Sequence, residues 1–390
     1  MWQGPTPPQP GSFPTDPSIL QGQDSLAHLL EGQGGATLLT APQAAPRHLI
    51  VQPYKETFQS GWDAYVQQHA SGSICHLIAW KEVIERTFKY EPRYLLVTDH
   101  EKIVGVLPLF LVKNVLLGRT LISTPLGVYG GICADDEEAG GKLRSAACEM
   151  ARQEQVQYLE LRESWPVEAE GFQTKQLYVT FDLELPQSRE ELLKIFPRDT
   201  RYMIRKAQKN ELIAVVDNRQ LDTFYEIYSR SFSHLGTPVF SKRLFKNILE
   251  VMGERCELTT VWLGTKALAS VLSFRFRDWI LPYFGGSLVE GRPVAANNYM
   301  YYEVMGRALE AGVRRFDFGR SKLGSGSYAF KTQWNMRERP LPYQFYLVKR
   351  KSMPNFSPAN PKFKLAISMW KALPLPITKI LGPVMVRAFP

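Results

Sequence analysis

The chain has 390 residues, a formal net charge of +9, and hydrophobic and charged contents of 44% and 22%. These contents are close to those of average globular proteins, so a wholly disordered chain is excluded. No apolar run approaches the roughly 18 residues that a membrane-spanning helix needs, and the opening residues lack a secretory signal pattern. The four cysteines are far apart and adjoin no histidine cluster, so we expect a cytoplasmic protein without a disulfide scaffold or a metal site.

The charge is unevenly distributed along the chain. Residues 1–46 hold eight prolines, three acidic residues and no Lys or Arg, which predicts a disordered Pro-rich leader. Residues 349–390 hold eight basic residues and no acidic one. The body between them is therefore only mildly basic, and the high isoelectric point alone is weak support for nucleic-acid binding.

Residues 47–185 have the pattern of a mixed α/β domain. Helical periodicity is found over Phe58–Gln68, Trp80–Thr87 and Gly140–Gln155. Apolar runs predict strands over Arg93–Thr98, Ile103–Val112, Gln157–Arg162 and Tyr178–Leu183. A glycine-rich turn lies at Gly127–Gly131.

Residues 186–349 show a second pattern of alternating helices and strands, which predicts a second α/β domain. Ser188 and Glu191 form a capping-box pattern, and Pro197 suits the first turn of the next helix. The predicted helices are 188–196, 197–209, Leu221–Phe232, Ser241–Val251 and Asn297–Ala311. The predicted strands are Ala214–Val216, Leu258–Leu263, Ala267–Phe276, Trp279–Gly285, Arg315–Phe318 and Gln344–Val348. Two halves of similar element order indicate a duplicated fold.

Residues 350–390 are a basic, Pro-rich tail, in which seven prolines after Lys349 exclude one long helix. Within Lys362–Leu373, one helical face gathers Phe363, Ala366, Ile367 and Trp370. Two interpretations stay open: a helix docked on the body, or a membrane-surface anchor that binds anionic lipid at the inner face of the cytoplasmic membrane.

The segment Phe316–Lys331 carries the most informative motif. An apolar strand ends near Asp317, and glycines follow that permit positive φ and close approach of the backbone to a ligand. We take Asp317 and Lys331 as candidate catalytic residues. The candidate substrate-binding residues of this segment are Arg320, Ser321, Gly324, Gly326 and Tyr328. An ordinary glycine-rich connection and a satisfied buried acid would produce the same spacing.

The segment PRDTRYMIRKAQKN predicts a helix with one basic stripe. Arg201, Arg205 and Lys209 lie within about 100° of one another on that helix. Guanidinium groups bind phosphate through two parallel hydrogen bonds, so the stripe is a candidate phosphate-binding wall. A solvated basic face is the alternative. Asn298, near the start of the predicted helix at 297–311, is a further candidate substrate contact.

Several self-contained catalytic signatures are absent from the sequence. It has no Walker loop, no HExxH, no Gly-x-Ser-x-Gly elbow and no GxGxxG. Phosphoryl transfer, zinc hydrolysis and serine hydrolysis are therefore disfavoured.

Six segments occur in the order found in a known family. They are HLIAWKEVIERTF, IVGVLPLFLVKNVLLGRTLISTPLGVYGGICAD, YLELRES, RYMIRKAQK, LGTPVFSKRLF and FDFGRSKLGSGSYAFKTQW. Over roughly residues 50–348 the chain resembles the FemAB-related proteins associated with the PEP-CTERM/exosortase exopolysaccharide system. That family belongs to the GNAT superfamily and has CelD-like acyltransferases as relatives.

The resemblance implies an α/β (α+β) fold of two tandem GNAT-like acyltransferase domains with mixed central sheets. It also implies transfer of an acyl or aminoacyl group to an amine. The Phe-Lys motif of the Fem enzymes matches Phe330-Lys331, so Lys331 is implied to stabilise the developing oxyanion. The implied co-substrate is acyl-CoA or aminoacyl-tRNA, which makes tRNA a candidate partner, with no bound cofactor.

The leading hypothesis is an N-acyl- or aminoacyltransferase that acts on a small-molecule or lipid-linked precursor of the cell envelope or of an exopolysaccharide. Arg320 lies four residues before Gly324, which departs from the usual CoA-binding spacing, so the donor stays open. The alternative is a catalytically inactive GNAT-fold scaffold of a polysaccharide export system. Val128 and Asn335, where the family has Asn and Gly, support that alternative.

Overall fold

The computed structural model describes residues 47–114, 118–354 and 361–387, and of residues 361–366 it describes the backbone alone. The leader predicted for residues 1–46 lies outside this part of the chain. The described residues form helices packed on mixed sheets, so the predicted mixed α/β fold class is confirmed. The boundary expected at 185/186 stays a prediction, because strands from both halves join one sheet.

A four-stranded antiparallel sheet lies in the N-terminal half. Its strands are, in spatial order, β1 (Leu49–Pro53), β3 (Leu95–Asp99), β4 (Lys102–Leu107) and β7 (Cys133–Ala134). Helix α1 (Gln59–Gln68) and helix α3 (Glu137–Gln153) pack on this sheet. Apolar side chains alternate along β3, so that Leu95 and Val97 belong to one core cluster and Leu96 to another.

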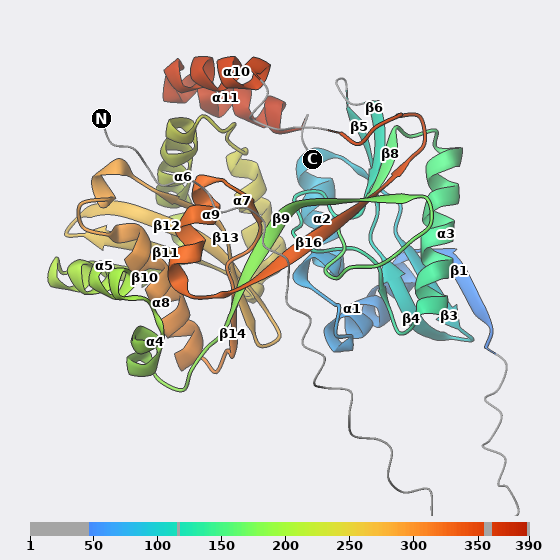
Figure 1. Ribbon diagram of the computed structural model, residues 1–390, viewed down its shortest axis with the longest axis horizontal. Coiled ribbons are helices and arrows are strands. Elements are labelled where there is room, and N and C mark those ends of the chain that lie inside the picture. The colour runs from blue at the N-terminus through green and yellow to red at the C-terminus, as the bar shows by residue number, and fades with distance from the viewer. Residues whose placement is uncertain (1–46, 115–117, 355–360, 388–390) are drawn as a thin grey trace, which may run out of the picture. The chain divides into compact units, whose positions relative to one another are not determined.

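A twelve-stranded mixed sheet runs through both halves (Figure 1). In spatial order its strands are β10 (Ile213–Val216), β11 (Cys256–Leu263), β12 (Lys266–Phe276), β13 (Trp279–Ser287), β14 (Arg315–Asp317), β9 (Phe172–Glu184), β16 (Arg337–Leu347), β8 (Tyr158–Leu161), β6 (Gly118–Ile122), β5 (Phe110–Asn114) and β2 (Glu91–Pro92), with β15 (Ser321–Lys322) paired to β9. Among the strand pairs of the described residues, β13–β14 and β6–β8 are the parallel ones.

The long strands β9 and β16 join the two halves. They pair antiparallel with each other, and β16 also pairs with β8 of the N-terminal half. Figure 1 shows them crossing the middle of the molecule. The last strand of the C-terminal half therefore completes the sheet of the N-terminal half.

Helices cover both faces of the sheet in the C-terminal half. On one face, α6 (Leu221–Leu235) and α7 (Lys242–Met252) enclose a core that also receives α2 (Ile78–Phe88) from the N-terminal half. On the other face, α8 (Ala296–Glu310) packs on the strands and α5 (Arg198–Lys209) packs on α8. Because both faces are covered, β12 is buried along nearly its whole length.

Strand β9 has one apolar and one polar face. Phe181 and Leu183 point to the apolar core, while Thr180 and Asp182 alternate with them. Asp182 lies in register between Asp317 of β14 and Arg337 of β16. The polar face thus gathers charged groups from three strands.

One predicted strand is wrong in its extent. The run Ile103–Val112 forms two strands, β4 and β5, which belong to different sheets. Residues 108 and 109 between them are not in a strand. Pro108 has no backbone N–H, so it interrupts the ladder and allows the chain to change sheets.

Strand β16 was predicted too short, at Gln344–Val348. It begins at Arg337 and contains two prolines, which disfavour a strand interior. The register shifts between Leu341 and Tyr343, on either side of Pro342, so an irregularity accommodates the proline.

The tail contains two helices, α10 (Pro361–Ala372) and α11 (Leu375–Val386), and α11 was not predicted. Both pack on α6. Trp370 of α10 is buried, as expected for a helix docked on the body. No helix within the described ranges is long and apolar enough to cross a membrane.

The ion pairs of Asp182 yield a stability prediction. Its buried carboxylate accepts hydrogen bonds from Arg339 (2.7 Å) and Arg337 (3.0 Å). In Asp182→Ala, the guanidinium of Arg339, whose side chain is 16% exposed, loses this carboxylate. We expect the free energy of unfolding in urea to fall by about 3 kcal/mol.

Arg337→Ala is the matched control for Asp182→Ala. The side chain of Arg337 is 66% exposed, so its removal should cost less than about 1 kcal/mol. Equal losses in the two variants would show that the buried pair with Arg339 is not what stabilises this junction.

Candidate active site between the two halves

A cavity of about 400 Å³ is lined by residues from both halves of the chain. The N-terminal half contributes residues 70–74, Tyr129, Ser164 and Trp165. The C-terminal half contributes residues 276–279, Leu281, Arg315, Asp317, Arg337 and Arg339. Four arginines and two aspartates face this space, so it is suited to an anionic ligand.

Aromatic rings hold two of these arginines in place. The guanidinium of Arg339 lies 4.9 Å from the ring centroid of Trp165, and that of Arg315 lies 5.2 Å from the centroid of Trp279. Arg315 also pairs with Asp278 at 3.4 Å. A third, Arg277, donates to the carbonyl oxygens of Val66 and His69. The guanidinium groups are therefore oriented before any ligand arrives.

Asp317 and Tyr129 contact each other at this cavity. The hydroxyl of Tyr129 donates to Oδ2 of Asp317. Oδ1 of Asp317 accepts from the hydroxyl of Thr180 at 2.7 Å and from the backbone N–H of Gly319 at 2.7 Å. Burial raises the pKa of Tyr129 well above its usual value, so the phenol stays protonated and donates. Asp317 is thus a buried acid with donors from both halves.

The glycine-rich turn places Tyr129. Gly130 has φ +143°, and a Cβ there would lie 2.2 Å from the side chain of Thr124. The Thr124 hydroxyl in turn donates to the carbonyl oxygen of Tyr129 at 2.8 Å. Nε2 of His76 lies 3.0 Å from the carbonyl oxygen of Gly131. The turn therefore needs its glycines to bring Tyr129 to Asp317.

Lys331 ends the short helix α9 (Gly326–Lys331), is buried, and does not line the cavity. Its ammonium group donates to the carbonyl oxygens of Phe318 (2.6 Å), Gly319 (2.8 Å) and Arg320 (3.3 Å). Burial lowers the pKa of Lys331 to about 8. The side chain thus holds the loop that presents Gly319 N–H to Asp317, and its contact with an oxyanion stays a prediction.

The other candidates of this loop lie in different environments. The guanidinium of Arg320 stacks 4.7 Å from the ring centroid of Tyr178 and donates to the hydroxyl of Tyr343 at 3.3 Å. Ser321 is buried, and its hydroxyl has no hydrogen-bond partner within the described part of the chain. Gly324 and Gly326 are exposed, and Tyr328 donates to Glu338. None of them lines the cavity.

The basic stripe on α5 also lies away from the cavity. Arg201 donates to the carbonyl oxygens of Lys194 and Phe196, at the C-terminal end of α4 (Arg189–Ile195). Arg205 and Lys209 are exposed. None of the three lines the cavity, so a phosphate contact for them stays a prediction outside this site. Asn298 is buried in the first turn of α8 and does not line it either.

Sequence reasoning missed Glu163, which directly precedes the lining residues Ser164 and Trp165. Its carboxyl group is buried, and burial raises its pKa to about 7. Oε2 accepts from the backbone N–H of Ile132 at 3.2 Å, and Arg144 lies 3.5 Å from Oε1. The available signal was an acidic residue just beyond a strand, since β8 ends at Leu161, whereas Asp317 was singled out at the end of its strand.

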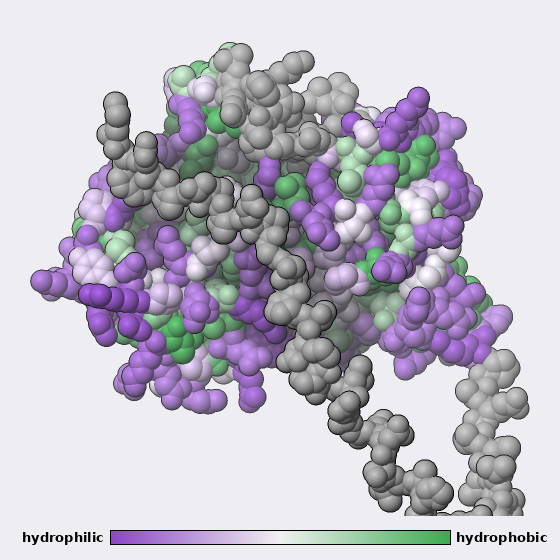
Figure 2. Space-filling view, viewed as in Figure 1, coloured by the Kyte–Doolittle hydropathy of each residue, from purple (hydrophilic) through white to green (hydrophobic). Residues whose placement is uncertain are grey.

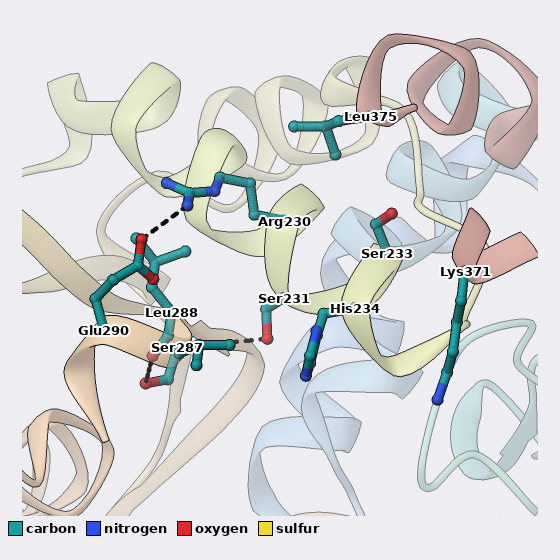
Figure 3. A pocket seen from close by; sticks show the side chains of 10 residues that line it. Arg230, Ser231, Ser233, His234, Ser287, Leu288, Glu290, Lys371 and Leu375 are labelled. Carbon is teal, nitrogen blue, oxygen red and sulfur yellow. Dashed lines mark hydrogen bonds and ion pairs between the residues drawn. The ribbon is translucent and has the colours of Figure 1, made fainter. Parts of the chain in front are cut away.

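A second cavity, of about 310 Å³, lies at the opposite end of β13 (Figure 3). It is lined by Arg230, Ser231, Ser233 and His234 of α6, by residues 287–290, and by Lys371 and Leu375 of the tail. Arg230 pairs with Glu290 at 3.0 Å. Leu281 lines the first cavity and Ser287 the second, which separates them by about 20 Å along the strand.

Comparison with known proteins agrees with this architecture. Residues 196–332 match the family described as Acetyltransferase (GNAT) domain, a range that includes Asp317 and Lys331. The structure is similar to that of FemX, with a TM-score of 0.64, 19% identity, and coverage of 76% of this chain and 98% of that one. No curated protein matches the sequence.

Two further solved structures share the fold. The C-terminal domain of a putative lysylphosphatidylglycerol synthetase from Agrobacterium fabrum has a TM-score of 0.51 and 13% identity, covering 75% of this chain and 92% of that one. A tandem GNAT protein from the clavulanic acid biosynthesis pathway has a TM-score of 0.50 and 11% identity, covering 78% and 100%. At these identities the likeness shows the fold alone. The expected GNAT-like fold is confirmed, and the link to the PEP-CTERM/exosortase system stays a prediction.

Glu163 predicts a defined pH dependence of stability. Its folded-state pKa of about 7 lies above the usual 4.5, so the folded protein retains a proton that the unfolded chain has released. The free energy of unfolding should therefore fall by up to about 3 kcal/mol as the pH rises from about 4.5 to about 7. Glu163→Gln retains an acceptor for Ile132 N–H and should remove this contribution.

The measurement is urea unfolding of both proteins at pH values between about 4.5 and 8. The stability of Glu163→Gln relative to the unsubstituted protein should rise with pH, and other titrating groups cancel in that difference. Glu138→Gln, at an exposed position, should show no such rise. A pH-independent difference for Glu163→Gln would mean that Glu163 is ionised in the folded state.

Proposed function

We propose that the protein is an N-acyl- or aminoacyltransferase acting on an amine of a cell-envelope or exopolysaccharide precursor. The observation that carries this proposal is the position of Asp317. It lies within the segment that matches the GNAT domain, and it faces an arginine-lined cavity beside Tyr129 of the other half. The donor is an acyl-CoA or an aminoacyl-tRNA, supported by the GNAT match and by the resemblance to the Fem enzymes respectively.

The reaction needs no covalent enzyme intermediate. The acceptor nitrogen attacks the carbonyl carbon of the donor thioester or ester, and the carbon–sulfur or carbon–oxygen bond of the donor breaks. The proton lost by the amine ends on the leaving thiolate or alkoxide. Asp317, with Tyr129 hydrogen-bonded to it, is the group at the cavity that relays this proton, and general acid–base help of this kind contributes about 10²–10⁴-fold.

The arginines indicate what is bound. Arg315, Arg337 and Arg339 face the cavity from two strands, and guanidinium groups suit phosphates and carboxylates. Both candidate donors carry phosphates, and so do nucleotide-linked and lipid-linked envelope precursors. We place the acceptor in this class, and a lipid-linked acceptor places the protein at the inner face of the cytoplasmic membrane.

Replacing Asp317 tests the proton relay. Asp317→Asn keeps an oxygen acceptor and removes the negative charge, so we expect turnover to fall by at least about 100-fold. The assay is transfer from radiolabelled acetyl-CoA, long-chain acyl-CoA or aminoacyl-tRNA to envelope extracts, with a purified acceptor once one is labelled. Asp222→Asn, at an exposed position of α6, is the matched control.

The outcomes of the Asp317 experiment are distinct. Turnover of Asp317→Asn within about threefold of the unsubstituted protein would remove Asp317 from the mechanism. If none of the three donors binds saturably in equilibrium dialysis, the inactive-scaffold alternative is supported instead.

Lys331 has a separate test because its ammonium group contacts loop carbonyl oxygens. Lys331→Met should reduce turnover by at least about 100-fold, and Lys331→Arg should restore part of it. If Lys331 positions the loop, thermal unfolding of Lys331→Met will also occur at a lower temperature. If it contacts only the reacting oxyanion, the unfolding temperature will be unchanged. Turnover of Lys331→Met within about threefold would remove its assigned role.

A further inference from the structure

Helix α11 is held on the body by one narrow face. Thr378, Gly382 and Val386, spaced four residues apart, are its buried residues. A Cβ at Gly382 would lie only 2.6 Å from the carbonyl oxygen of Val239. The backbone of α11 therefore rests directly on the segment before α7, which fixes which face of the helix points outward.

The outward face of α11 is apolar. Ile380 is 72% exposed and Val384 is 69% exposed. The exposed apolar residues of this helix are Ile377, Ile380, Leu381, Val384 and Met385, here called the α11 stripe. They recur every three or four residues and so lie side by side along the helix. A contiguous exposed apolar patch of this kind marks an interaction surface.

The tail that contains the α11 stripe is rich in basic residues. Residues 349–390 contain eight basic residues and no acidic one. Arg387, directly after the C-terminal end of α11, is exposed, Lys371 belongs to α10, and Lys379 pairs with Glu226 at 2.6 Å. Figure 2 shows hydrophobic residues at its upper left, where Figure 1 places α10 and α11. Apolar residues bordered by Lys and Arg are the pattern of a helix that lies in a membrane interface.

The adjacent helix α10 packs on the body through large side chains. Its residue Trp370 is buried, and the side chains of Ile367 and Lys371 lie within 2.7 and 2.9 Å of where a Cβ on Gly236 would be. The apolar face predicted as a membrane anchor in Lys362–Leu373 is thus directed, at these residues, toward α6. Among the large apolar side chains of α10 that the structure describes, Ile367, Met369 and Trp370, only Met369 is exposed.

We propose that the α11 stripe docks the protein on an anionic lipid surface. Ile380, Val384 and their neighbours enter the boundary between headgroups and acyl chains, while Arg387 contacts the anionic headgroups. The charge of the tail favours lipid over a protein partner, because eight cations without an acid complement a uniformly negative surface. Membrane docking is independent of the transferase proposal, since it needs no donor or acceptor.

Co-sedimentation of the full-length protein with vesicles tests this proposal. The vesicles are phosphatidylcholine alone or phosphatidylcholine with about 30 mol% phosphatidylglycerol, at about 0.1 M and about 0.5 M salt. We expect binding to the anionic vesicles, weakened by salt, and little binding to phosphatidylcholine alone. Ile380→Glu/Val384→Glu should reduce the binding at least about tenfold. Ile213→Glu, at a 61% exposed apolar position of β10, is the matched control and should bind normally.

The two substituted positions are exposed, so their unfolding temperatures should match that of the unsubstituted protein. Binding of Ile380→Glu/Val384→Glu equal to that of the unsubstituted protein would overturn the proposal. So would failure of the unsubstituted protein to bind anionic vesicles. A concentration-dependent dimer in sedimentation velocity, abolished by the same substitutions and accompanied by no vesicle binding, would assign the α11 stripe to self-association and overturn it equally.

Discussion

The buried carboxylate of Asp317 is the constraint on which the junction of the two halves depends. A carboxylate at this depth needs hydrogen-bond donors, because burial without them would cost several kcal/mol. Its donors come from Tyr129 of the N-terminal half, Thr180 of β9 and the loop after β14. Asp182 lies beside it in register, and the arginines of β16 offset the charge of both. The halves must therefore dock in one way for these carboxylates to be satisfied.

This constraint also shapes the cavity. The same strands that satisfy the two aspartates place Arg315, Arg337 and Arg339 at its wall, and two of these guanidinium groups rest on tryptophan rings. Lys331 supports Asp317 indirectly. Its ammonium group donates to carbonyl oxygens of the loop whose Gly319 N–H donates to Asp317. The structural contacts and the proposed catalytic roles of Asp317 and Lys331 thus involve the same residues. Variants here need a stability measurement beside every rate.

The local sequence pattern was sufficient to predict most helices and strands and part of the candidate site. The helices of the C-terminal half and strands β11 to β13 follow from periodicity, and Asp317 was found because an apolar strand ends there before a glycine-rich loop. Tyr129 and Arg339 could not be predicted from local pattern. Tyr129 reaches Asp317 from a loop of the other half, and Arg339 reaches the cavity through the long-range pairing of β16 with β9. The stripe of Arg201, Arg205 and Lys209 shows the converse limit, since helical spacing identifies a face and not what lies opposite it.

The tail illustrates the same limit in the choice between two apolar faces. From its sequence, the segment around Trp370 fitted either a helix docked on the body or a membrane-surface anchor, since its apolar face is flanked by lysines. The structure buries Trp370 against the body and exposes Ile380 and Val384 in the following helix. The determining residue is Gly382, because only a glycine lets α11 rest on the backbone at Val239 and so turns the α11 stripe outward. A single small residue thus decides which apolar surface is left for a partner.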